Sequence, residues 1–344
     1  MPKFLIIEPD QSKEQKSGRG ARGRNLELFL QEYYRKSAAS TISLKELSGS
    51  NSYKVDHLFI GIPSQISRKE LNRVSCRKVH LFDYGDHEKV IWKNTDKELL
   101  SSVARSYLKT WTQKNWGNEF NWGTLPIRRH KRLYYCARWS NFLTKDSFNK
   151  MERNFDTTFL GNPMVGWTED YGDERRITRI KWLEEISSEK RFSFSGGFFK
   201  REINSELINK SSNELFKQLF LKKGRINFIS YYNLMQNAQT ALTPPGNALW
   251  SYRHYEAIYA GALPISADFR AAKMLTPLPK DGMIHVGKGE SVLPHLEEAL
   301  RVRRDNPELP NQNLQSIEKY MSYGLYDRKK TLLLERFMKQ IEKD

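Results

Sequence analysis

The chain has 344 residues, of which 38% are hydrophobic and 28% charged, and its mean hydropathy is −0.70. This length is enough for two domains that each bury a core, and this composition excludes collagen-like, low-complexity and membrane-embedded proteins. Cys76 and Cys136 are too few for a disulfide framework or a cysteine-rich zinc site. Because only a short apolar run, Phe4 to Ile7, follows Lys3, we expect no signal peptide and a reducing, cytoplasmic setting.

The positive charge is concentrated in the first part of the chain. The whole chain carries 57 Lys and Arg against 40 Asp and Glu, a net charge of +17. Residues 1–150 hold 28 of these basic residues and 15 of the acidic ones, a net charge of +13, whereas residues 151–344 have a net charge of +4. A well-solvated basic surface would account for this excess. A groove for a polyanion such as nucleic acid, anionic lipid headgroups or an acidic glycan would do so equally.

The first predicted element is a strand from Lys3 to Ile7. Glu8 and Asp10 follow it, where a parallel sheet usually meets its ligands, so Asp10 is a candidate catalytic carboxylate. Residues 16–24, KSGRGARGR, lack the ending of a phosphate-binding P-loop. They form either a surface loop or a loop that holds an anionic acceptor through arginines. These arginines are Arg19, Arg22 and Arg24. An amphipathic helix is expected from Asn25 to Lys36.

Two further strands are predicted at His57 to Ile62 and Lys78 to Phe82, with a helical segment between them at Gln65 to Arg73. The second strand runs into a polar turn that holds two aspartates and a histidine. Carboxylates at a strand's end are well placed to act as a general base, which accepts a proton from an attacking group. The candidates of this turn are Asp83, Asp86 and His87. The same residues have turn chemistry, so a plain turn is the alternative.

Residues 96–114 predict a helix, after which aromatic residues alternate with basic ones. The basic residues that we expect to contact an acceptor are Arg128, Arg129, Lys131 and Arg132. Such cations neutralise phosphates while aromatic rings stack on bases or sugars. The same aromatic residues suit a sugar site or a plain core. A strand is expected from Leu133 to Cys136.

A strand at Asp156 to Leu160 and a helix at Arg175 to Lys190 come next, and we expect the boundary between the domains in that helix. The first, basic domain would then comprise residues 1–187 and the second residues 188–344. Phe192 to Ser195 is expected to begin the second sheet and to run into a glycine loop. The candidate ligand residues of this loop are Gly196, Gly197, Lys200 and Arg201.

The rest of the chain alternates helix and strand, which predicts an α/β domain with a parallel sheet. The expected strands are 226–230, 240–243, 262–265 and 283–286. The expected helices are 203–221, 231–236, 290–303, 313–323 and 327–343.

Residues 243–266, TPPGNALWSYRHYEAIYAGALPIS, predict the end of a strand, a tight turn, a helix that stops at Gly261 and a new strand. The turn lets the backbone come close to a ligand. Ser251 is placed to cap the helix, whose N–H groups together with Arg253 would form an anion site suited to a diphosphate. Glu256 lies on nearly the same helical face and can accept hydrogen bonds from the hydroxyls of a sugar.

The pattern Pro-x-Gly, Ser-x-Arg-x-x-Glu-Ala and Ala-Gly-x-x-Pro-Ile resembles the nucleotide-sugar site of exostosin-like glycosyltransferases. It is carried by Pro244, Pro245, Gly246, Ser251, Arg253, Glu256, Ala257, Ala260, Gly261, Pro264 and Ile265. The resemblance extends over roughly Arg191 to Ser266 and is weak before it. It implies the α/β GT-B fold, with two Rossmann-like domains, a cleft between them and a C-terminal helix that crosses back to the first domain.

The same resemblance implies a nucleoside-diphosphate sugar as co-substrate and neither a cofactor nor a metal. Arg253 would bind its diphosphate and Glu256 its ribose. The full set of expected donor-binding residues is Gly196, Gly197, Lys200, Arg201, Pro245, Gly246, Asn247, Ser251, Arg253 and Glu256.

The resemblance thus implies a metal-independent, inverting glycosyltransferase. Together with the basic first part of the chain, it predicts transfer of a sugar, most simply from a UDP-sugar, to a hydroxyl of a polyanion. The preferred acceptor is a hydroxymethylated base in DNA, a phage type of DNA modification in which the target nucleotide is flipped out of the duplex. One alternative acceptor is a bacterial surface polysaccharide or lipopolysaccharide, with the basic surface held at anionic headgroups. An alternative of another class is a non-catalytic nucleic-acid-binding protein on the same scaffold.

Overall fold

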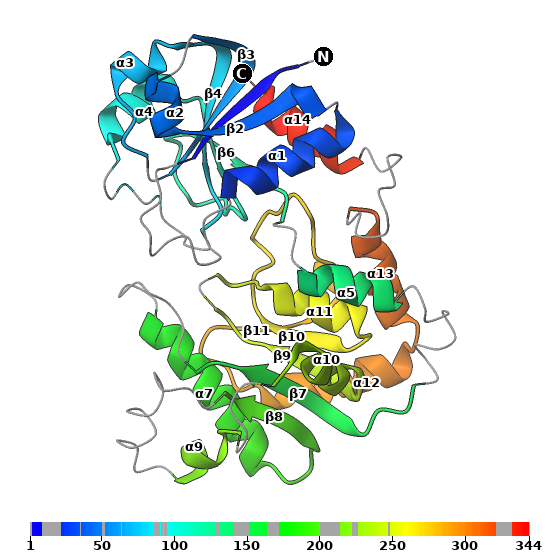
Figure 1. Cartoon of the computed structure of the whole chain (residues 1–344). Coiled ribbons are helices and arrows are strands. Elements are labelled where there is room, and N and C mark those ends of the chain that lie inside the picture. Colours follow the sequence, from blue (N-terminus) through cyan, green and yellow to red (C-terminus); the bar gives the residue numbers. More distant parts are fainter. Residues whose placement is uncertain are drawn as a thin grey trace. The chain divides into compact units, whose positions relative to one another are not determined.

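A computed structural model describes the chain over residues 2–8, 22–34, 36–49, 52–62, 64–85, 90, 92, 95–127, 131–140, 151–163, 172–199, 214–221, 226–246, 248–320 and 332–343. The chain divides into two compact units (Figure 1). Unit 1 comprises Met1–Arg129, Ala271–Pro277 and Leu325–Asp344, and unit 2 comprises His130–Arg270 and Leu278–Gly324.

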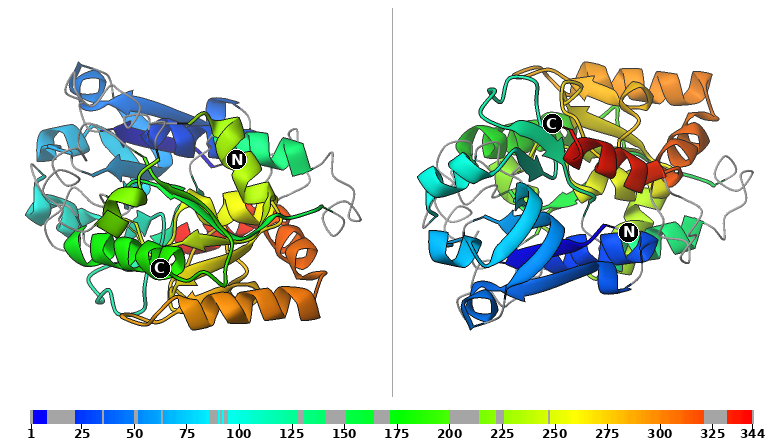
Figure 2. Two further views of the ribbon diagram at one scale, coloured as in Figure 1. Left: turned by 90° about the horizontal axis from the view of Figure 1, so that it is seen from below. Right: turned by 90° about the horizontal axis from the view of Figure 1, so that it is seen from above.

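Unit 1 is built on a six-stranded parallel sheet with the strand order β2-β1-β3-β4-β5-β6, and its blue to cyan strands run side by side in Figure 2. The order reverses between β1 and β3, which makes this the switch point of the sheet. The elements are β1 (Phe4–Glu8), α1 (Arg22–Tyr33), the 3-10 turn η2 (Lys36–Ala38), β2 (Ala39–Ser43), α2 (Leu44–Gly49), β3 (Tyr53–Gly61), α3 (Arg68–Leu71), β4 (Val74–Asp83), α4 (Lys97–Val103), β5 (Ser106–Lys109), β6 (Asn121–Thr124) and α14 (Leu332–Ile341).

Helices cover both faces of this sheet. On one face, Leu47 of α2 and Leu100 of α4 pack in one cluster with alternate residues of the strands, such as Leu58. On the other face, Phe337 of α14 lies 5.4 Å from Phe29 of α1 and 6.2 Å from Phe59 of β3, measured between ring centroids. The last helix of the chain therefore belongs to unit 1, which confirms the expected return of the C-terminal helix.

A chain of buried polar side chains crosses that second face. Ser106 Oγ lies 2.6 Å from His80 Nδ1, and His80 Nε2 lies 3.0 Å from His57 Nδ1. His57 Nε2 in turn lies 3.0 Å from Glu342 Oε1, just after α14. All three contacts are satisfied if each imidazole is neutral, donates from Nε2 and accepts at Nδ1. Burial lowers the pKa of His80 to about 3, which favours this neutral form.

Unit 2 is built on a five-stranded parallel sheet with the order β11-β10-β9-β7-β8, whose switch point lies between β7 and β9. The elements are α5 (Lys131–Ser140), β7 (Phe155–Gly161), α7 (Gly172–Ser188), β8 (Phe194–Phe198), α9 (Glu214–Gln218), α10 (Phe228–Gln236), β9 (Ala238–Thr243), α11 (Tyr252–Tyr259), β10 (Leu263–Ala267), the 3-10 turn η3 (Lys280–Gly282), β11 (Ile284–Val286), α12 (Leu293–Asp305) and α13 (Leu309–Glu318).

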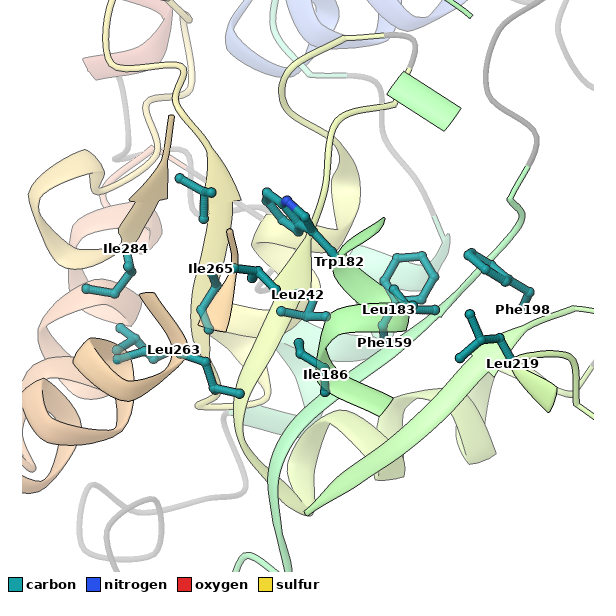
Figure 3. Packing of buried hydrophobic residues seen from close by; sticks show 14 of the residues in the cluster. Phe159, Trp182, Leu183, Ile186, Phe198, Leu219, Leu242, Leu263, Ile265 and Ile284 are labelled. Atoms are coloured by element: carbon teal, nitrogen blue, oxygen red, sulfur yellow. The ribbon is translucent and has the colours of Figure 1, made fainter. Parts of the chain in front are cut away.

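The core of unit 2 lies between this sheet and the helices α7, α9 and α12. Figure 3 displays Trp182 and Leu183 of α7 against side chains of all five strands of the sheet. The strand residues are Phe159, Phe198, Leu242, Leu263, Ile265 and Ile284. On the opposite face the small side chains of Ala241 and Ala257 meet, so α11 comes close to β9. The architecture is therefore α/β with two Rossmann-like units, as the fold class predicted.

Several expected boundaries were wrong. The structure divides the chain near residue 130 and not between 187 and 188, because β7 is a strand of the second sheet and α7 packs against that sheet. The strand expected at 133–136 is part of the helix α5, in which buried residues recur at helical spacing. These are Leu133, Cys136, Ala137 and Ser140.

Two other elements also differ from the expectation. The helix expected over residues 96–114 ends at Val103, because Ala104 is extended and Tyr107 belongs to β5. The strand expected at 226–230 is replaced by the start of α10, where the Asn227 side chain caps the helix by accepting a hydrogen bond from the backbone N–H of Ser230 at 2.8 Å.

Candidate functional site

The turn at residues 244–246 leaves the carboxyl end of β9 beside the carboxyl end of β7, at the switch point of unit 2. The predicted order of strand, loop, helix and strand is confirmed by β9, α11 and β10, since β9 and β10 pair in parallel. The expected left-handed helix end is confirmed too: Gly261 has a φ of 69°, and the Ala262 N–H donates to the Ala257 carbonyl at 3.0 Å. Ligands of open parallel sheets bind at this position.

Two buried arginines of α7 hold the turn through its carbonyl groups. Arg179 donates from Nε to the Pro245 carbonyl and from Nη1 to the Asn162 carbonyl, each at 2.8 Å. Arg175 donates from Nη1 to the Gly246 carbonyl at 3.2 Å. The exposed fractions of Arg175 and Arg179 are 8% and 7%. Both guanidinium groups are therefore fixed against the loop that the sequence singled out.

Arg253 of α11 reaches the carboxyl end of β7 at the same switch point, and its charge acts on Arg179. Its Nη2 donates to the Leu160 carbonyl at 2.8 Å, and its guanidinium carbon lies 4.7 Å from the ring centroid of Phe159. Gly161 makes this approach possible, because a Cβ on that residue would lie 2.9 Å from Nη2. The Arg253 Nε atom is buried without a hydrogen-bond partner among the described residues.

These three arginines, the arginine cluster, concentrate positive charge at the switch point. Burial, followed by the charges of Arg253 and Arg175, lowers the pKa of Arg179 to about 9. Within the described ranges, no carboxylate lies within ion-pair distance of Arg179 or Arg253, and the three hydrogen bonds given above all end at backbone carbonyls. A bound anion would offset this repulsion and supply the missing acceptor. Arg175 and Arg179 were not among the site residues predicted from the sequence.

Glu256 lies one helical turn after Arg253 and is 3% exposed. The Tyr231 hydroxyl of α10 donates to its Oε2 at 2.6 Å. Burial raises the pKa of Glu256, while the Tyr231 hydrogen bond and the charges of Arg253 and Arg132 oppose that rise. The residues expected to hold a diphosphate and a ribose therefore lie next to each other.

The N-terminus of α11 is organised by His254 and not, as expected, by the hydroxyl of Ser251. Ser251 occupies the cap position, but its Oγ is buried without a hydrogen-bond partner among the described residues. The Ser251 N–H donates instead to His254 Nδ1 at 3.1 Å, and His254 Nε2 lies 2.8 Å from Ser266 Oγ. Burial lowers the pKa of His254 to about 3, so the neutral ring joins the helix start to β10.

Gly196 and Gly197 lie inside β8 and not in a loop after it, so the expected glycine loop was wrong. Their φ angles are 126° and 142°, and a Cβ at either position would collide with the carbonyl oxygen of Phe159 or of Leu219. Close backbone packing explains this glycine pair. Lys200 and Arg201, like Asn247 in the turn, lie outside the described residues, and the donor role of all five stays a prediction.

Among the candidate bases, Asp83 ends β4 and is buried in an ion pair. Its Oδ2 lies 2.9 Å from Lys109 Nζ, and its Oδ1 accepts the Gly85 N–H at 2.6 Å. The exposed fractions of the two charged side chains are 1% and 0%. Asp10, Asp86 and His87 lie outside the described residues. Because both oxygens of Asp83 already have partners, Asp83 is poorly suited to accept a proton. The catalytic role of Asp83, and that of Asp10, Asp86 and His87, stays a prediction.

The expected acceptor residues are divided between the units. Arg24 of unit 1 pairs with Glu27, and half-buried Arg132 of unit 2 lies 5.3 Å from the ring centroid of Phe228. Arg22 and Lys131 begin α1 and α5, but their side chains are outside the described set. Arg19, Arg128 and Arg129 are outside it altogether. The placement of Lys131 and Arg132 in the first domain was therefore wrong.

Comparison with solved structures identifies the fold. A glycosyltransferase from Rickettsia africae matches with a TM-score of 0.57 and 12% identity over 100% of both chains. A UDP-forming α,α-trehalose-phosphate synthase from Burkholderia vietnamiensis matches with a TM-score of 0.51 and 9% identity over 99% of both chains.

The chain has the GT-B fold. It spans 59% of the length of another match, the pneumococcal O-GlcNAc transferase GtfA in complex with UDP and GlcNAc, with a TM-score of 0.47 and 12% identity. No protein-family profile matches the sequence, and neither does any curated protein. No helix in the described part of the chain has the length and apolar character needed to cross a membrane.

Proposed function

We propose that the chain is a glycosyltransferase whose donor is a nucleoside-diphosphate sugar bound by unit 2. The arginine cluster is the observation that carries this proposal. It places two buried guanidinium groups and a third beside the Pro-Pro-Gly turn, at the switch point where α/β sheets bind ligands. A diphosphate carries negative charge that would complement the guanidinium groups of Arg179 and Arg253. UDP is our first choice of carrier, in line with the UDP-forming enzyme of the same fold.

In the proposed reaction, an acceptor hydroxyl oxygen forms a bond to the anomeric carbon of the sugar. The bond from that carbon to the diphosphate oxygen breaks, and its electron pair leaves with the diphosphate. Arg179 and Arg253 would stabilise the growing negative charge. A carboxylate would accept the hydroxyl proton, and Asp83, Asp86 and Asp10 remain the proposed candidates. Inversion at the anomeric carbon and independence from metal also remain part of this proposal.

For the acceptor we propose a polyanion, with a hydroxymethylated base in DNA as the preferred example. The basic excess supports this choice, because unit 1 holds 30 Lys and Arg against 18 Asp and Glu, and unit 2 holds 27 against 22. A bacterial surface polysaccharide or lipopolysaccharide is the second candidate, supported by the same charge. A cytoplasmic setting fits the first acceptor.

The test is incubation of the protein with a labelled UDP-sugar and each acceptor. Transfer of label to hydroxymethylcytosine DNA, but not to unmodified DNA or glycan, would support the preferred acceptor. Transfer to the glycan would support the second. DNA binding that weakens with salt, without UDP binding or UDP-sugar turnover, would instead identify a nucleic-acid-binding protein on a transferase scaffold.

A further inference from the structure

Tyr231 and Glu256 form a buried pair next to the arginine cluster. The exposed fraction is 7% for Tyr231 and 3% for Glu256, and the distance from the tyrosine hydroxyl to Glu256 Oε2 is 2.6 Å. The groups that act on the carboxylate from the helices around it are Tyr231 of α10, Arg253 of α11 and Arg132 of α5. Tyr232 of α10 and Cys136 of α5 are also near, and the charge of Glu256 helps to raise the pKa of each.

This hydrogen bond restricts a side chain that would otherwise have several orientations. A glutamate has three rotatable side-chain bonds, whereas the phenol of Tyr231 is rigid and buried between α10 and α11. The bond holds Oε2 in place and so limits the orientations that the carboxylate can adopt. Glu256 Oε1 accepts no hydrogen bond from the described residues and is thus available to a donor on a ligand.

We propose that Tyr231 is a positioning residue that sets the recognition of ribose hydroxyls by holding Glu256 in one orientation. This inference rests on the proposed function, because it takes the nucleotide of the donor as the ligand. It adds a residue that the sequence pattern does not contain. Tyr231 lies 25 positions before Glu256, on the helix that precedes β9.

The pair also determines how nucleotide binding depends on pH. Two hydroxyl donors are accepted best by an ionised carboxylate, so binding weakens as pH falls through the pKa of Glu256. The Tyr231 hydroxyl stabilises the ionised form and lowers this pKa against the effect of burial. Removing the hydroxyl therefore raises the pKa and moves the acid limb of binding to higher pH. A purely structural tyrosine would not cause that movement.

The experiment is calorimetric titration of UDP and of 2′-deoxy-UDP into wild type, Tyr231→Phe and Tyr232→Phe, from pH 5 to 8. Tyr232 is the matched control, because it is the neighbouring buried tyrosine and does not hydrogen-bond to Glu256. We expect wild type to prefer UDP. In Tyr231→Phe, UDP should bind about tenfold more weakly at pH 7. The preference for UDP over 2′-deoxy-UDP should be smaller, and binding should begin to weaken at a higher pH. Tyr232→Phe should behave as wild type.

The inference would be overturned if a folded Tyr231→Phe variant kept the wild-type affinity for UDP, the wild-type preference for UDP over 2′-deoxy-UDP and the wild-type pH dependence of binding. So would equal binding of UDP and 2′-deoxy-UDP by wild type, and in both cases the proposed function would stand. If wild type bound neither nucleotide, the proposed function itself would fail. Thermal unfolding of each variant without ligand checks that the loss of one oxygen atom leaves the fold intact.

Discussion

Replacement of Arg179 by methionine tests whether the arginine cluster binds a diphosphate or only supports the turn. Methionine keeps much of the length of the side chain and removes its charge. A hydrogen bond to a charged group contributes about 1.5–3 kcal/mol, and each 1.4 kcal/mol changes a dissociation constant about tenfold. Loss of one such bond to the diphosphate should therefore raise the Kd for UDP by about 10- to 100-fold, measured by calorimetry.

The stability of the unliganded protein should change far less than this affinity. The variant loses the two hydrogen bonds from Arg179 to carbonyls, but it also removes a buried cation whose pKa is lowered to about 9 by burial and by the neighbouring arginines. Removing this cation relieves the cost of burying its charge and its repulsion from Arg253 and Arg175, which offsets part of the loss of the two hydrogen bonds. The rise in unfolding temperature caused by UDP should then shrink in Arg179→Met.

Arg153→Met is the matched control. Burial lowers the pKa of Arg153 to about 9 as well, and this side chain donates to the carbonyls of Gln236, Ala238 and Ala260. These acceptors lie at the end of α10, at the start of β9 and at the end of α11, and thus at the opposite end of β9 from the turn. If Arg179→Met bound UDP as tightly as wild type, or if both variants lost the same affinity, the reasoning about the cluster would be refuted.

Three further predictions concern stability, measured by urea titration. Gly196→Ala should cost about 3 kcal/mol or more, since its φ is 126° and the new Cβ would collide with the carbonyl oxygen of Phe159; a near-neutral effect would contradict the packing argument. Asp83→Asn should lower the free energy of unfolding by about 3–5 kcal/mol, because it leaves the Lys109 ammonium buried and unpaired. A variant that keeps full stability and loses only turnover would instead favour Asp83 as the base. Because the pKa of His80 is lowered to about 3 in the folded protein, its neutral form should contribute fully to the free energy of unfolding above pH 6.5. This contribution should fall as the pH drops toward 3, and about 2 kcal/mol of it should be lost at pH 5. An equally steep loss in a His80→Phe variant would exclude His80 as the source.

The sequence was most informative where local chemistry decides the structure. The turn, the helix start near Ser251 and the helix end at Gly261 all depend on residues adjacent in the chain, and the structure has each at the expected place. Elements with ambiguous periodicity were harder to predict. The run from Leu133 to Cys136 has residues that favour strands, yet burial at helical spacing places it in α5.

The arginine cluster could not be read from the sequence, because its members come from different elements. Arg175 and Arg179 are four positions apart on α7, a spacing equally typical of an exposed helical face. Only the placement of α7 beside the carboxyl ends of β7 and β9 buries them against the turn. Tyr231 was missed for the same reason, since its hydroxyl meets Glu256 only in the folded unit.

A crystal structure of the protein with bound UDP would test the central claim most directly. Our account predicts that the diphosphate oxygens accept hydrogen bonds from the guanidinium groups of Arg179 and Arg253, and that a ribose hydroxyl donates to Glu256. A nucleotide bound away from the turn at residues 244–246, with these three side chains unchanged and out of reach, would contradict it.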